Sequence, residues 1–101
     1  MTNRDQQTLT IASGAQASGE YYSPGGVRLM TLLAPSTLPE SVTLQKAEST
    51  GGTFRTFQDV GVSVSVSAGM ARTVVVSGGF YRLYASVAVA ANRAFTVELD
   101  W

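Results

Sequence analysis

The chain of 101 residues has no histidine, no cysteine and few charges. The absence of cysteine excludes a disulfide framework and thiolate chemistry. The absence of histidine removes the commonest general base and the commonest metal ligand. Charged residues make up only 14% of the chain, against roughly 25% in a typical soluble domain. Stability must therefore come from packing, and the surface must consist largely of small and uncharged polar side chains.

The balance of charge argues against a nucleic-acid partner. Seven basic and seven acidic residues give a formal net charge of zero, and the basic residues are scattered along the chain. Nucleic-acid-binding proteins concentrate positive charge on one surface. Weak surface charge also leaves little repulsion between copies, so the composition suits a protein that works inside an assembly.

Long hydrophobic runs are absent as well. No apolar run approaches the roughly 18 residues of a membrane span, so we expect no membrane partner. Residues 1–7 are polar and lack the apolar region of a secretory signal. We therefore expect the chain to be made in the cytoplasm.

What the chain does contain is the alternating pattern of β-strands, most clearly in segment 62–67, where valine and serine alternate. Side chains along a strand point to opposite faces in turn, so the three valines are expected to form one inward row. Similar segments recur along the chain, separated by turn residues such as Gly51-Gly52 and Gly78-Gly79. This regular spacing predicts an all-β fold, an antiparallel β-sandwich or jelly roll of about seven or eight short strands.

The predicted organisation is a polar N-terminal arm, residues 1–7, followed by a single β-sandwich domain, residues 8–101. Segment 27–34 is apolar on both faces, which predicts a central strand or a second buried interface. The β-branched run 73–76 favours a strand buried on both sides. The main strands are expected at 8–11, 27–34, 41–48, 53–57, 62–67, 72–77, 80–89 and 93–101.

Candidate sites for chemistry are few. Glu98 and Asp100 lie two residues apart on one strand face, but a terminal strand favours a solvated edge over a hydrolase pair. Asp59 is a single acid in its loop, so no metal site is predicted, and no cofactor is expected. The aromatic residues that could stack on a sugar ring are Tyr21, Tyr22, Tyr84 and Trp101. Because Tyr21 and Tyr22 point to opposite faces, at most one of them is free.

Several segments together resemble a group of small virion proteins of tailed bacteriophages. In that group a G-x-R-L strand leads through a proline loop to an L-x-F-Q strand and a D-G-G-T-[FY] hairpin. This chain has Thr50 where the hairpin pattern has Asp. The matching segments are Gly26-Val27-Arg28-Leu29, Ala34-Pro35, Val42-Thr43-Leu44-Gln45, Thr50-Gly51-Gly52-Thr53-Phe54, Phe80-Tyr81-Arg82-Leu83-Tyr84-Ala85 and Ala91-Asn92-Arg93-Ala94-Phe95-Thr96-Val97.

The resemblance implies a non-catalytic structural protein of the virion, a decoration or cement protein on the surface of the head that is assembled in the host cytoplasm. The expected partners are the major capsid protein or other virion proteins and further copies of the chain, for which we expect a trimer. Alternatives are a small adaptor of tail or fibre and a module that binds host glycan. The residues expected to contact partners are Arg4, Asp5, Tyr22, Pro35, Leu38, Pro39 and Trp101.

Overall fold

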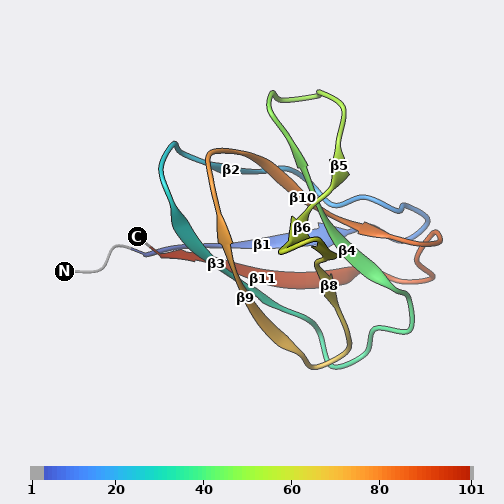
Figure 1. The fold of residues 1–101 in the computed structure, drawn as a ribbon. Coiled ribbons are helices and arrows are strands. Elements are labelled where there is room, and N and C mark those ends of the chain that lie inside the picture. The colour runs from blue at the N-terminus through green and yellow to red at the C-terminus, as the bar shows by residue number, and fades with distance from the viewer. Residues whose placement is uncertain (1–3, 101) are drawn as a thin grey trace.

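The structure, a computed structural model, describes residues 4–100 (Figure 1). The chain forms strands and no helix over this range, so none of it is a helix that could cross a membrane. The strands are β1 (Arg4–Ile11), β2 (Tyr21–Ser23), β3 (Arg28–Leu33), β4 (Val42–Ala47), β5 (Arg55–Thr56), β6 (Gln58–Asp59), β7 (Val62–Ser63), β8 (Ser65–Val66), β9 (Ala71–Val76), β10 (Gly79–Ala85) and β11 (Arg93–Asp100).

Two antiparallel sheets form the layers of a sandwich. Sheet A has the strand order β1-β11-β3-β9, and sheet B has the order β2-β10-β4-β5, with β8 also paired to β4. The hairpin of β6 and β7 forms a small sheet of its own. The predicted all-β sandwich is confirmed.

The core lies between the two sheets and follows the period-two pattern of the strands. Every second residue of the long strands points inward, and these residues form one hydrophobic cluster. Sheet A contributes Leu9, Ile11, Met30, Leu32, Val74, Val76, Phe95, Val97 and Leu99, whereas sheet B and its connections contribute Tyr21, Leu38, Val42, Leu44, Val64, Val66, Tyr81, Leu83, Ala85 and Val89.

The first strand begins earlier than the sequence suggests. Residues 4–7 belong to β1 and pair with β11, from Arg4 opposite Asp100 to Gln7 opposite Val97. They were expected in a polar arm, a prediction that is wrong for these four residues, whereas residues 1–3 lie outside the described range. The segment looks like a tail because β1 is an edge strand with one solvent-facing side, where polar side chains are tolerated.

The last strand is central, not an edge. β11 pairs with β1 on one side and with β3 on the other. The expectation that Glu98 and Asp100 lie on a sheet edge is therefore wrong, although both side chains do point to the outer face of sheet A. Position at the end of the sequence does not determine position in a sheet, because strand order is fixed by tertiary pairing.

Three further predictions need correction. Val64 and Val66 are buried but Val62 is exposed, because the tight β6–β7 hairpin turns it away from the core. Val75 is exposed although the run 73–76 was expected to be buried on both faces, because no strand within residues 4–100 covers the outer face of β9. β10 ends at Ala85 and does not continue to Val89, since residues 86–92 form a loop that hydrogen-bonds to residues 14 and 15.

The β6–β7 turn carries a strained residue. Val60 has a φ of 51° and Gly61 a φ of 76°, so both central residues adopt the left-handed conformation of a type I′ turn. That conformation suits asparagine or glycine and is unfavourable for a β-branched side chain. The Val60 side chain is 96% exposed, so no packing compensates for the strain.

We predict that Val60→Asn stabilises the fold by about 1 kcal/mol, because it relieves this backbone strain without loss of buried area. Chemical denaturation of the two proteins measures the difference. The matched control is Val87→Asn, an exposed valine outside the turn, which should change stability by less than about 0.5 kcal/mol. Equal effects of the two substitutions would contradict the assignment of strain to Val60.

Candidate functional site

The surfaces that folding leaves open are the outer faces of the two sheets. On sheet A the outward residues form cross-strand rows set by the register of β1, β11, β3 and β9. One row contains Arg4, Asp100, Leu29 and Val75, and the next contains Gln6, Glu98, Thr31 and Thr73. The face thus changes from charged on the β1 side to apolar and hydroxyl-bearing on the β9 side.

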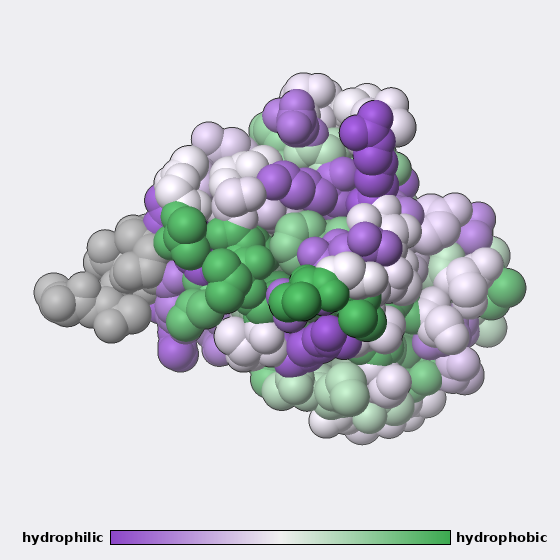
Figure 2. Space-filling view, in the orientation of Figure 1, coloured by the Kyte–Doolittle hydropathy of each residue, from purple (hydrophilic) through white to green (hydrophobic). Residues whose placement is uncertain are grey.

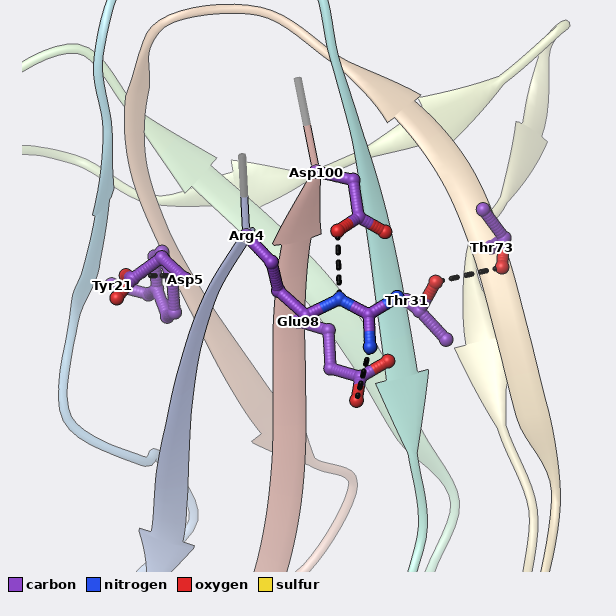
Figure 3. A network of polar contacts seen from close by, with 7 residues as sticks. All are labelled: Arg4, Asp5, Tyr21, Thr31, Thr73, Glu98 and Asp100. Carbon is purple, nitrogen blue, oxygen red and sulfur yellow. Dashed lines mark hydrogen bonds and ion pairs between the residues drawn. The ribbon is translucent and has the colours of Figure 1, made fainter. Parts of the chain in front are cut away.

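The three charged residues on this face, Arg4, Glu98 and Asp100, contact one another. Arg4 donates from Nε to Asp100 Oδ1 at 2.9 Å, and its Nη1 lies 3.8 Å from Glu98 Oε2 (Figure 3). The hydrogen bond from Arg4 to Asp100 and the charges of both acids raise the pKa of the Arg4 guanidinium above its ordinary value. The single Arg4 guanidinium therefore contacts both carboxylates, one cation with two acids.

Asp5 is held on the opposite side of β1. It accepts a hydrogen bond from the Tyr21 hydroxyl at 2.6 Å (Figure 3). Burial of the Tyr21 ring, followed by this hydrogen bond, raises the pKa of the Tyr21 hydroxyl above its usual range. The contact ties β1 of sheet A to β2 of sheet B and closes that side of the sandwich.

The other end of the same rows carries what we call the apolar corner, formed by Val27, Leu29 and Val75. These side chains are 77%, 48% and 55% exposed, and Leu29 and Val75 are direct cross-strand neighbours. Figure 2 shows hydrophobic surface over the region of β3 and β9. Contiguous exposed apolar residues on a rigid sheet indicate a contact surface.

Beside the apolar corner lies a pair of threonines. The hydroxyls of Thr31 and Thr73 are 2.8 Å apart, in register across β3 and β9 (Figure 3). One hydroxyl donates to the other, so a single hydrogen bond links the two side chains on this uncharged part of the face. The pair extends the weakly polar surface towards the edge of the sheet.

The outer face of sheet B has a different character because aromatic rings gather on it. The rings of Tyr22 and Phe80 lie 5.0 Å apart. The Arg82 guanidinium lies over the Phe54 ring at 4.1 Å and near the Tyr84 ring at 5.4 Å, while its Nε donates to Gln45 Oε1 at 2.8 Å. Arg82 is thus held between two rings by cation–π contacts.

A shallow hollow of about 330 Å³ lies beside the β4–β5 hairpin. Lys46, Glu48, Arg55 and Phe57 are among its lining residues. Lys46 is engaged elsewhere, since its Nζ donates to Ser77 Oγ at 2.8 Å. The hollow combines one aromatic ring with charged side chains of both signs.

The proline loop, residues 35–40, is fixed to the end of the sandwich by one ion pair. Arg93 donates to both carboxylate oxygens of Glu40, at 3.0 and 3.2 Å. Both side chains are largely buried, with 12% and 7% exposed. Hydrogen bonds from Arg93 lower the pKa of the Glu40 carboxyl below its usual value of 4.5. A two-point contact of this kind holds the loop in one geometry.

The structure separates the residues that the sequence predicted as partner contacts. Arg4 and Asp5 are engaged within the fold, on opposite sides of β1. Tyr22 is 57% exposed and Tyr21 is buried, which confirms that only one of these two rings is free. Pro39 is exposed and Pro35 half-buried, but Leu38 belongs to the core and is not presented to a partner. Trp101 lies outside the described residues.

Sequence reasoning did not select the apolar corner as a site, although one signal pointed to it. Segment 27–34 is apolar on both faces, and the structure assigns one of these faces to the core and leaves Val27 and Leu29 exposed on the other. Val75 could not be separated from its buried neighbours, because the run 74–76 is entirely valine. The aromatic cluster on sheet B could not be predicted either. It requires β10 to lie beside the β4–β5 hairpin, and this neighbourhood is seen only in the fold.

Within residues 4–100 no three histidine, cysteine, aspartate or glutamate side chains come together in a group that could bind a metal ion. Comparison with known proteins adds no relative, since no family model, no curated protein and no solved structure matches this chain.

The Glu40–Arg93 contact predicts a pH dependence of stability. Because the pKa of Glu40 is lower in the folded chain, the contact contributes stability above pH 4.5 that is lost as the pH falls through the depressed folded value. Glu40→Gln should remove this contribution and make the decline of stability from pH 7 to pH 3 shallower. Denaturation across this range tests the prediction, and parallel curves for the two proteins would contradict it.

Proposed function

We propose that the chain is a non-catalytic structural protein of a tailed-bacteriophage virion, a decoration protein that docks on the major capsid protein at the head surface and associates with further copies of itself. The observation that carries the proposal is the apolar corner, Val27, Leu29 and Val75, on the outer face of sheet A. Exposed apolar side chains on a rigid sheet lose little conformational entropy when a partner covers them.

The charge distribution supports the same proposal. The charges on the outer face of sheet A are Arg4, Glu98 and Asp100, and they are already paired with one another. A partner that covers this face therefore separates few charges from water without compensation. The resemblance to small virion proteins directs the proposal to a capsid, where many weak contacts across a repetitive lattice act together.

The location on the particle can be measured directly. Mass spectrometry of purified particles should find the chain at a copy number comparable to that of the capsid lattice. A single ring of about three to twelve copies would instead support the alternative of a tail or fibre adaptor. Absence from the particle would contradict both versions.

We predict that Leu29→Lys lowers the occupancy of particles about tenfold or more, because a charge replaces the centre of the apolar corner. Lysine is chosen because position 29 pairs with Asp100, so the new charge meets an acid and the fold is retained. The control is Val87→Lys, since Val87 is 57% exposed and Leu29 48%, and it should leave occupancy unchanged. Full occupancy with Leu29→Lys would contradict docking through this corner.

A host-glycan-binding module is a second candidate, supported by the exposed Tyr22 ring on sheet B. Sugar rings stack on exposed aromatic faces, and Phe80 supports the Tyr22 ring at 5.0 Å. A glycan array with the intact protein tests this candidate, and any binding should be lost in Tyr22→Ala. Because Tyr22 and Leu29 lie on different sheets, the two substitutions separate glycan binding from docking.

A further inference from the structure

The free edge of β9 is the least protected strand edge of the sandwich. β9 pairs with β3 on one side, and no strand within residues 4–100 pairs with its other side. β9 runs for six residues, contains no proline and has one charged residue, Arg72. Proteins normally protect long edge strands with charges, prolines, bulges or short length, because an open edge is a template for another strand.

The other edges show these protections. β1 is tied to β2 by the hydrogen bond from Tyr21 to Asp5 and has two charged residues, Arg4 and Asp5, and β2 is three residues long and is followed by Pro24. β5 and β8 are two residues each. On β9, by contrast, the Arg72 guanidinium is drawn to β8, where it donates to the Ser65 carbonyl at 3.3 Å. The Arg72 guanidinium is thus hydrogen-bonded to the opposite sheet, so its charge does not protect the free edge of β9.

The hydrogen-bond pattern shows which backbone groups are open. Ala34 N–H donates to the Met70 carbonyl at 2.9 Å, which continues the β3–β9 ladder and fixes its phase. In an antiparallel ladder the hydrogen-bonded pairs alternate with non-bonded pairs. The residues whose N–H and C=O groups point away from β3 are therefore Ala71, Thr73 and Val75.

We propose that β9 pairs antiparallel with β9 of a second copy, about a two-fold axis at Thr73, so that two sheets A join into one continuous sheet. In this register Thr73 lies opposite the partner's Thr73, and Val75 lies opposite the partner's Ala71. Each outward-pointing backbone group of one copy then meets one of the other. The inference concerns the isolated chain and is independent of docking on a capsid.

Complementarity of the side chains favours a second copy in this register. On the outer face the row of Leu29 and Val75 would continue into the partner's Ala71 and Leu33, so apolar residues meet apolar residues. The Thr31–Thr73 row would continue into the same pair of the partner. A register displaced by two residues would place Thr73 opposite the partner's Val75 and mix hydroxyl with apolar side chains.

The chain's charge and symmetry fit this pairing. A formal net charge of zero gives no long-range repulsion between copies. Identical strands that pair antiparallel do so about a two-fold axis, which closes after two copies. We therefore propose a two-fold dimer in place of the trimer that was expected from the sequence.

A charge-swap experiment tests the proposal. Sedimentation velocity over a concentration series up to about 1 mM should show the intact protein shifting to twice its monomer mass of 10.6 kDa. Thr73→Lys and Thr73→Glu, each alone, should raise the dimer dissociation constant about tenfold or more, because like charges then lie directly opposite each other. An equal mixture of the two variants should restore the dimer.

Control substitutions at the far edge of sheet A test whether the effect is specific to the edge of β9. Thr8→Lys and Thr8→Glu place the same charges on the outer face of β1, at the far edge of sheet A, and should leave association unchanged. Circular dichroism and melting temperature verify that all variants fold. A protein that stays monomeric over the whole series, a mixture that stays monomeric, or an equal effect at Thr8 would each overturn the proposal.

Discussion

The pairing of β11 with both β1 and β3 determines how sheet A is built. It joins the two ends of the described chain, with β1 at an edge of the sheet and β11 in its interior. Its register also decides which side chains face the core, because a shift by one residue would exchange the two faces of the strand. With Phe95, Val97 and Leu99 inward, Glu98 and Asp100 must point outward. There Arg4 contacts both carboxylates, and Leu29 lies beside Asp100 on the open face.

The inner faces of sheets A and B are therefore occupied by the hydrophobic core. Without cysteine or histidine, and with no metal-binding group among residues 4–100, the two sheets are held together by apolar packing. The outer faces and edges of the sheets are the surfaces that remain open to other molecules. On sheet A the charges are concentrated near β1, whereas the apolar corner and the unpaired edge lie at β3 and β9. This asymmetry is why we propose the side of β3 and β9 for contact with other proteins.

The sequence predicted the inward rows well where alternation was unambiguous, as at Leu9 and Ile11 or at Phe95 to Leu99. It failed where tertiary neighbours decide the outcome. The uniform valines of 74–76 conceal which face is open, and the apolar loop after Ala85 resembles a strand because Val89 is buried by another loop. Of the candidate site, the two-faced strand 27–34 and the opposed rings of Tyr21 and Tyr22 were readable. The position of β9 at an edge was not, since strand order does not follow from sequence order.

The open edge of β9 is the surface at which we propose that copies of the chain meet. Residue-resolved amide hydrogen exchange can detect this pairing, because alternate residues of β9 should behave differently. In dilute protein the amides of Thr73 and Val75 should exchange rapidly, while those of Val74 and Val76, bonded to β3, should be protected. At high concentration the amides of Thr73 and Val75 should become protected as well. Protection of these two amides in dilute protein, or their continued rapid exchange at high concentration, would contradict the account.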